Sequence, residues 1–224
     1  MELKVPSEVK IDGYIPTEED LTFTGSCREL FKNNRFAWLL NNYTSKLRFN
    51  NITNLVETFI DTETDTDLSN LTFYLSNKCD LSYMFKRSNL SHLPRIKGEV
   101  YNLTGIFDSC KNGAAIPEDF FNDLTFPSNG YTIYFGNMFY SCKNLIKTPS
   151  FDVFKKILGT PTPSVYSSFY YHLFNYSDVS EIKNLPVLYT NSNVGSNMFD
   201  SMVNYTSKLS SFTFEPNQTA RFRY

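Results

Sequence analysis

Segments with the hydrophobic pattern of a β-strand recur along the chain, separated by turn-forming residues. Each segment alternates apolar with polar residues or is rich in β-branched and aromatic side chains, and both patterns favour strands. The segments are residues 21–24, 46–52, 71–75, 100–107, 131–135 and 210–214. The pattern therefore predicts one strand in each of several successive units, with the strands stacked in parallel.

Three segments between these strands are predicted to be helical. Ser26 can cap a helix over residues 26–40, although two asparagines in its middle, Asn33 and Asn34, weaken it and could split it. Residues 117–124 predict a short helix, because a proline stands in its first turn and acidic residues lie at its positive end. Residues 151–157 are its counterpart in the following unit.

A degenerate repeat is clearest at residues 137–149, which read Asn-Met-Phe-Tyr-Ser-Cys-Lys-Asn-Leu-Ile-Lys-Thr-Pro. Its phenylalanine, here called the anchor, recurs in other units after a methionine, leucine or isoleucine. The anchors are Phe85, Phe107, Phe139, Phe174 and Phe199, with Phe59 as a weaker copy. The five clear anchors are about 22, 32, 35 and 25 residues apart, which is the range of units that stack into an array.

The repeat predicts one array of about six or seven irregular units whose anchors form a buried column. A single unit cannot bury its apolar face, so the core must come from stacking. We expect residues 1–25 to cap the array, residues 26–214 to form it, and residues 215–224 to be a tail. The expected repeat core is Phe85, Phe107, Cys110, Phe139, Cys142, Leu145, Phe174 and Phe199.

The pattern Met-Phe-x-x-Cys-x-x-Leu-x-x-x-Pro, with Phe139, Cys142, Leu145 and Pro149, resembles the BspA-like class of leucine-rich repeats. The preceding unit matches at its phenylalanine, cysteine and proline, but alanines replace the leucine. The resemblance extends over residues 81–210 and is poor before them. It implies an α/β repeat fold: a leucine-rich-repeat-like solenoid with one short parallel strand per unit and short helices or turns on the other face.

The same resemblance implies binding and surface display, so the chain is not expected to be an enzyme. Similar repeats occur in bacterial surface proteins and in proteins of tailed phages. We therefore expect a structural or interaction protein of a phage virion, from the tail or associated with the capsid, whose partners are other subunits of the assembly. The alternatives are a bacterial surface adhesin and a glycan-binding or carbohydrate-active protein.

The composition fits a soluble globular protein and argues against several partners. The 224 residues are 41% hydrophobic, carry a formal net charge of −2 and show no basic stripe, so no nucleic-acid partner is expected. No run approaches the roughly 20 apolar residues of a membrane span, and none is expected. The start of the chain lacks the apolar core of a signal peptide, which fits a virion location, whereas a cropped export signal would fit the bacterial surface.

Candidate catalytic and metal sites lack the motifs that such chemistry requires. The histidines, His92 and His172, are accompanied by no nucleophile elbow and are expected to be packing residues. No phosphate-binding glycine motif is present, and no cofactor is expected. The alternating carboxylates of residues 61–67 suggest calcium, but Thr66 stands where an EF-hand needs glycine. We therefore expect an exposed acidic loop and no metal site.

Cys110 and Cys142 occupy equivalent places in neighbouring units. We expect them to be neighbours in a buried column, where each serves as a small apolar group. Stacked strands lie about 4.8 Å apart, a separation that a disulfide can also span. A cytoplasmic origin favours the reduced thiols, and the reduced state is our prediction.

Several Asn-x-Ser/Thr triplets are candidate glycosylation sites, among them one at Asn102. A chain rich in asparagine and threonine produces such triplets by chance. Because Asn102 lies inside a predicted strand, we expect it to satisfy backbone groups at a corner of its unit instead of carrying sugar.

Aromatic residues make up 17% of the chain, and its tyrosines are the candidate binding surface. Tyrosine covers a large contact area at low entropic cost, which suits it to protein interfaces. Aromatic rings could equally serve as platforms for a glycan, while a carbohydrate-active enzyme would also need paired acids about 5–10 Å apart. The candidate interface residues are Tyr134, Tyr140, Tyr166, Tyr170, Tyr171 and Tyr189, some of which should belong to the core.

Overall fold

The computed structural model describes residues 15–127, 133–154, 171–185, 202–203, 205–206 and 208–214. Its largest element is a parallel five-stranded sheet with the strand order β1-β2-β4-β6-β7. The strands are β1 (Thr22–Ser26), β2 (Arg48–Asn54), β4 (Thr72–Asp80), β6 (Arg95–Asn102) and β7 (Leu124–Thr125). Among the strands of this sheet, spatial neighbours are therefore also neighbours in chain order.

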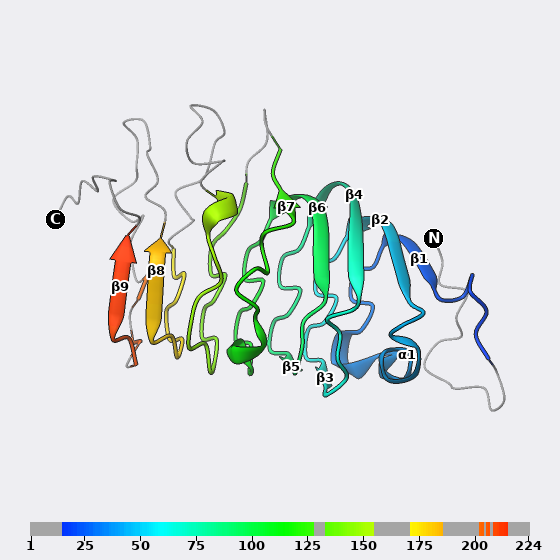
Figure 1. The fold of residues 1–224 in the computed structure, drawn as a ribbon, viewed down its shortest axis with the longest axis horizontal. Helices are drawn as coiled ribbons and strands as arrows, with labels where there is room; N and C mark the ends of the chain where they lie inside the picture. The colour runs from blue at the N-terminus through cyan, green and yellow to red at the C-terminus, as the bar shows by residue number, and fades with distance from the viewer. Residues whose placement is uncertain are drawn as a thin grey trace.

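Two smaller parallel pairs accompany this sheet, β3 (Glu63–Thr64) with β5 (Asn89–Leu90) and β8 (Glu181–Leu185) with β9 (Ser211–Phe214). Helices are few in the described part: α1 (Ala37–Tyr43) and the 3-10 turns η1 (Lys32–Asn34) and η2 (Gly113–Ala115). The strands follow one another along the long axis of the molecule, from β1 near one end to β8 and β9 near the other (Figure 1). The fold is therefore α/β with parallel strands, as predicted.

Large apolar residues fix the register of the sheet. Phe49 of β2 lies opposite Phe73 of β4, which in turn lies opposite Ile96 of β6. The ring centroids of Phe23 and Phe49 are 4.9 Å apart, and those of Phe49 and Phe73 are 4.2 Å apart. A slip by one residue would turn these rings to solvent, so their burial selects the observed pairing.

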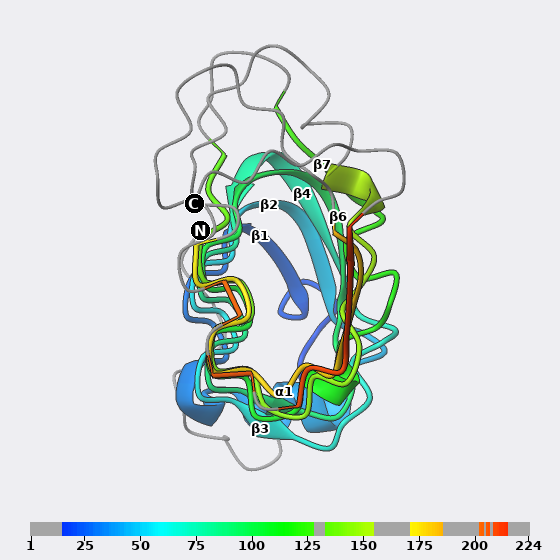
Figure 2. The same ribbon diagram turned by 90° about the vertical axis from the view of Figure 1, so that its left-hand side faces the viewer.

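After β1, β2, β4 and β6 the chain turns and returns along the other side of the molecule, where successive turns overlie one another (Figure 2). We call this side the turn wall; it comprises residues 29–34, 57–62, 83–88, 105–110, 137–142 and 172–177 and the described residues of 202–206. A backbone N–H of each turn donates to a carbonyl of the next, as from Phe31 to Thr58 at 2.8 Å and from Phe85 to Ile106 at 2.9 Å. Hydrogen bonds therefore join successive turns on the turn wall as well as in the sheet.

A column of phenylalanine rings runs through the interior, with one ring from each of six successive turns. The predicted anchors from Phe85 to Phe174 stack with centroids 5.4–5.5 Å apart and interplanar angles of 9–17°. Phe59, predicted as a weaker anchor, stacks onto the column in the same way, and Phe31, which was not predicted, extends it further toward the N-terminal end. All of its members are fully buried: Phe31, Phe59, Phe85, Phe107, Phe139 and Phe174.

The last described turn corrects the position of one anchor. The N–H of Phe174 donates to the carbonyl of Met202 at 2.8 Å, and each earlier anchor donates to the residue just before the next anchor. This register places Val203, half-buried against the core, in the position predicted for Phe199. Phe199 itself lies outside the described residues. The prediction failed because a Met-Phe pair is too short to set the register of a degenerate repeat.

The helix predicted over residues 26–40 is wrong for most of its length. The segment begins with the last residue of β1 and continues as turns that include the 3-10 turn η1, and only α1 is α-helical. Asn33, Asn34 and Phe36 have φ values of 54°, 60° and 51°. A left-handed residue interrupts a right-handed helix, so these three positions confine α1 to the end of the segment.

The helix predicted over residues 117–124 is also wrong. This segment forms consecutive turns, with the N–H of Phe120 bonded to the carbonyl of Pro117 at 3.1 Å, and then enters β7. Its hydrogen bonds link residues three apart instead of the four that an α-helix requires. Of the helix predicted over residues 151–157, residues 152–154 form a single helical turn and the remainder lies outside the described residues.

Polar side chains end several strands and start the turns that follow. β6 ends at Asn102, earlier than predicted, because its Oδ1 accepts the N–H of Thr104 at 3.0 Å. Asn54 and Asp80 accept the N–H two residues later in the same way, at 2.8 Å and 2.7 Å. The prediction that Asn102 serves backbone groups at a corner is therefore confirmed.

The ends of the predicted array are described only in part. Within the predicted cap, residues 22–25 belong to β1 and pair with β2, while residues 1–14 lie outside the described residues. The tail predicted at residues 215–224 also lies outside them.

Replacing Phe139 with alanine should lower the free energy of unfolding by about 3–5 kcal/mol, because the ring is removed from the middle of a packed column. Urea denaturation followed by circular dichroism measures the change. Tyr74, which is 51% exposed on β4, is the control, and its change to alanine should alter stability by no more than about 0.5 kcal/mol. Equal effects of the two changes would contradict the role of the column.

Gly105→Ala should destabilise the protein more than Gly25→Ala. Both glycines have positive φ, 58° and 79°, but an ideal Cβ on Gly105 would lie 2.4 Å from the ring of Tyr83, whereas nothing lies within 4 Å at Gly25. We expect a loss of about 1 kcal/mol at Gly25 from backbone strain and about 1–3 kcal/mol more at Gly105 from the clash. Adding Tyr83→Ala should relieve the extra loss, and urea denaturation of the three variants tests this.

Candidate functional site

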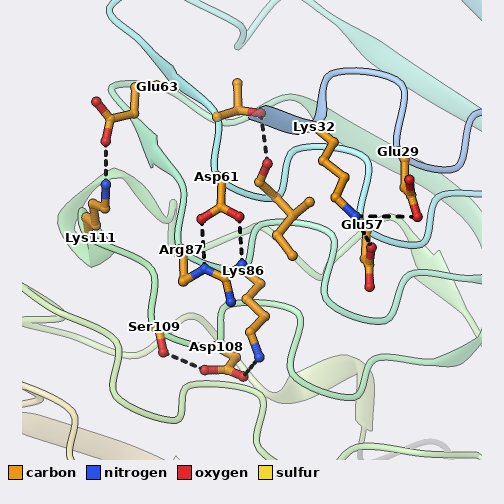
Figure 3. A network of polar contacts seen from close by, with 12 residues as sticks. Glu29, Lys32, Glu57, Asp61, Glu63, Lys86, Arg87, Asp108, Ser109 and Lys111 are labelled. Carbon is orange, nitrogen blue, oxygen red and sulfur yellow. Dashed lines mark hydrogen bonds and ion pairs between the residues drawn. The ribbon is translucent and has the colours of Figure 1, made fainter. Parts of the chain in front are cut away.

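The turn wall presents charged side chains in its N-terminal turns, and these pair from one turn to another (Figure 3). Arg87 bonds Asp61 of the preceding turn with two nitrogens, at 2.6 Å and 2.7 Å. Lys86 bonds Asp108 of the following turn at 2.6 Å, and the Ser109 hydroxyl donates to the same carboxylate. The charges of this part of the wall are therefore largely used within the protein.

The same pairing extends to the two ends of the charged region. Lys32 lies 2.9 Å from Glu57 and 3.5 Å from Glu29, and Lys111 bonds Glu63 (Figure 3). The hydrogen bond from Arg87 lowers the pKa of Asp61, and the bond to Glu57 raises the pKa of Lys32. Both shifts keep the partners charged at neutral pH, so the pairs persist under ordinary conditions.

The alternating carboxylates of the acidic loop at residues 61–67 each contact a side chain of a later turn or loop. Besides Asp61 and Glu63, Asp65 accepts a bond from Ser91 at 3.1 Å, and Asp67 lies 3.9 Å from the ring of His92. Among the described residues, no three histidine, cysteine or acidic side chains are placed to hold a metal ion. His92 is exposed on this surface, so its prediction as a packing residue is wrong.

Further along the turn wall, aromatic side chains replace the charged ones. The Tyr176 and Tyr205 rings stack with centroids 4.6 Å apart and an interplanar angle of 5°, and Tyr140 meets Tyr176 edge-on at 5.7 Å. His172 contacts Tyr171 at 4.1 Å and Tyr140 at 6.0 Å. We call these five residues the tyrosine cluster. Tyr171 and Tyr176 are each 42% exposed and Tyr205 is 73% exposed, so the cluster offers ring surface to solvent.

The repeat explains why these rings meet. Tyr176 and Tyr205 each stand two residues after the anchor position of their turn, as do Asp61 and Arg87 in theirs. Side chains at equivalent positions of successive turns lie above one another, so the position that forms an ion pair early in the wall forms a ring stack later. Partial loss of solvent contact, followed by the electrostatic effects of the neighbouring Tyr205 and Tyr140 phenols, raises the pKa of the Tyr176 phenol, which is protonated and uncharged at neutral pH.

Polar groups hold the cluster in place. The side-chain amide nitrogen of Asn175, itself buried, lies within hydrogen-bond distance of Nδ1 of His172, at 3.0 Å. Lys143 donates to the carbonyl of Tyr176 at 3.4 Å. His172 is thus half-buried among aromatic rings, which agrees with its prediction as a packing residue.

Of the predicted interface tyrosines, Tyr140 and Tyr171 belong to the cluster. Tyr134 is exposed but lies beside the end of β6, where it bridges Asn102. Tyr166, Tyr170 and Tyr189 lie outside the described residues. The sequence prediction missed Tyr176 and Tyr205. Each stands two residues after an anchor position, and this shared offset would have identified the pair if Val203 had been recognised as an anchor position.

The predicted repeat-core residues lie in the interior, apart from Phe199, which is outside the described residues. Cys110, Cys142 and Leu145 are buried beside the phenylalanine column, and the cysteines are free thiols. Burial raises the pKa of Cys27 and of Cys79 to about 12. These thiols therefore remain protonated and unreactive at neutral pH.

Comparison with known proteins identifies no relative: no protein-family model, no curated protein and no solved structure matches this chain. No helix in the described ranges has the length and apolar character needed to cross a membrane.

Thiol titration with a chromogenic disulfide at pH 8 should label the native protein slowly and all four cysteines after denaturation. Burial blocks access to all four thiols, and the raised pKa values of Cys27, Cys79 and Cys142 leave little reactive thiolate at those three. Fast labelling of the native protein would show that the turns open readily, and fewer than four labelled thiols after denaturation would show that a disulfide had formed.

Proposed function

We propose that this chain is a solenoid of the leucine-rich-repeat type, similar to the BspA-like class, and that it serves as a non-catalytic interaction module. Support comes from the succession of parallel strands, the hydrogen-bonded turn wall and the column of equivalent phenylalanines. Units of this kind bury their apolar faces only against each other and leave one exposed surface per turn for a partner.

The tyrosine cluster is the proposed binding surface, and its exposure is the observation that carries the proposal. Tyr176 and Tyr205 hold each other in place by stacking, so their orientation is largely fixed before a partner arrives. Pre-ordered aromatic side chains lose little conformational freedom on binding and are frequent among the residues that dominate interface energetics. Charged neighbours toward the N-terminal end are paired internally, so the cluster is the part of the turn wall best suited to contact a partner.

The partner is proposed to be another protein, a subunit of a larger assembly. A phage virion, with the chain in the tail or associated with the capsid, is the favoured setting; a bacterial cell surface, where the chain would act as an adhesin, is the alternative. The favoured setting rests on the resemblance of the repeat to repeats of tailed-phage proteins. The tyrosine cluster also supports it, because the exposed surface there consists of aromatic rings and not of unpaired charges.

Glycan binding is a second candidate function, and the geometry of Tyr205 favours it specifically. One face of this ring stacks on Tyr176, and the side chain as a whole remains 73% exposed. A flat ring held open to solvent could support the apolar face of a sugar, while neighbouring hydroxyl and ammonium groups supply hydrogen bonds.

Quantitative mass spectrometry of purified particles from the native source tests the proposal. We expect the chain at a fixed copy number per virion. The Tyr176→Ala/Tyr205→Ala variant should associate with particles at least about 30-fold less than wild type, since loss of a central aromatic pair typically costs 2 kcal/mol or more of binding free energy.

Tyr74→Ala provides the matched control, because Tyr74 is also an exposed tyrosine but lies on β4 instead of the turn wall. It should associate normally, and circular dichroism should show all variants folded. A chain absent from particles, but binding immobilised glycans in a manner that depends on Tyr205, would favour the second candidate. Association that is equally strong in all variants would exclude the tyrosine cluster.

A further inference from the structure

Cys110 and Cys142 lie at equivalent positions in successive turns, each three residues after its anchor. Backbone hydrogen bonds hold the two turns together on both sides of the pair: Ser109 N–H donates to Tyr140 O, and Lys143 N–H donates to Cys110 O, both at 2.7 Å. Equivalent residues of hydrogen-bonded neighbouring strands lie about 4.8 Å apart, within the Cα separations that a disulfide spans.

The side chains of the pair also meet. Interaction with the Cys110 thiol, together with burial, raises the pKa of the Cys142 thiol. On another side, an ideal Cβ on Gly113 would lie 2.9 Å from the Cys142 sulfur, so that sulfur occupies the space left by the missing side chain. The Cys142 sulfur is thus held between Gly113 and Cys110 and needs no large rearrangement to approach its neighbour.

The same position is occupied by a hydroxyl residue in four other turns, at Thr62, Ser88, Ser177 and Thr206, and by Asn34 in the first turn. Ser88 donates to the carbonyl of its own anchor at 2.8 Å, and Thr62 donates to the carbonyl of Phe31 at 2.6 Å. A small polar side chain therefore suffices for packing at this position. Two adjacent turns carry thiols instead, and a pair of thiols has a chemistry that a pair of hydroxyls lacks.

We infer that Cys110 and Cys142 form an oxidative modification site, at which a peroxide converts the two thiols into a disulfide that joins successive turns. One thiolate attacks a peroxide oxygen, which yields a sulfenic acid and, after protonation, water. The second thiolate attacks the sulfenic sulfur and displaces the hydroxyl group, which leaves as water. Two thiols and one hydrogen peroxide thus give one disulfide and two water molecules.

Burial sets the rate of this reaction and the disulfide changes the stability of the array. The peroxide can reach the pair only when a turn opens, so oxidation should be slow in the folded protein and faster in mild denaturant. Once formed, the bond closes the loop between residues 110 and 142 and restricts the unfolded chain. The oxidised protein should therefore need more urea to unfold than the reduced protein.

Hydrogen peroxide added to the reduced, full-length protein is the test. After the remaining thiols are alkylated in denaturant, we expect an intact mass showing the loss of two hydrogens and a tryptic cross-link between the peptides of Cys110 and Cys142. The urea midpoint should rise and return to its original value after dithiothreitol. Oxidation should accelerate at urea concentrations below the midpoint.

Cys142→Ser is the control, because serine already occupies the equivalent position at Ser88 and Ser177 and should be tolerated. This variant should give no cross-link and no rise in midpoint, and Cys110 should instead gain oxygen. Full alkylation of all four thiols after peroxide treatment, or a cross-link involving Cys27 or Cys79, would overturn the inference. Neither result would bear on the tyrosine cluster, so this test is independent of the proposed binding function.

Discussion

The phenylalanine column and the hydrogen bonds of the turn wall impose one constraint on the whole chain. Each turn must supply one apolar side chain to the column and one extended run of backbone to the wall. Successive phenylalanine rings stack at 5.1–5.5 Å, and backbone groups of successive turns pair at about 2.9 Å. What lies between these points is free to vary in length. This explains how anchors separated by about 22 to 35 residues can belong to one regular core.

Side chains outside the column help to select which turns pack against each other. The rings alone would stack in any order, since one phenylalanine resembles another. The bidentate pair of Arg87 with Asp61 and the half-buried pair of Lys86 with Asp108 join particular neighbours. Exposed pairs add about 1 kcal/mol or less to stability, but placing like charges together would be unfavourable, so their main effect is on the order of stacking.

Residues whose role depends on local pattern were predictable from the sequence, and residues whose role depends on register were not. β1, β2, β4, β9 and the anchors from Phe85 to Phe174 follow from periodicity and from the repeated anchor motif. β8 had no predicted counterpart, and β6 shares only residues 100–102 with the strand predicted at residues 100–107. Val203 could be identified as an anchor position only from a backbone bond to Met202. The helix expected over residues 26–40 failed because left-handed residues at η1 and before α1 override its apolar spacing. Tyr205 was missed for the same reason. Its stacking partner, Tyr176, lies in the preceding turn, and only the register between the two turns brings the rings together.

The two halves of the turn wall show how a uniform backbone can carry different surface chemistry. At one position of the repeat, Asp61 and Arg87 neutralise each other and leave little unsatisfied charge. At the same position later in the chain, Tyr176 and Tyr205 satisfy each other on one ring face and leave much of Tyr205 exposed. A stacked ring is oriented by its neighbour without being covered by it, so ordering and exposure coexist. The proposed binding surface therefore lies in the aromatic half, where a partner would meet side chains that are already ordered.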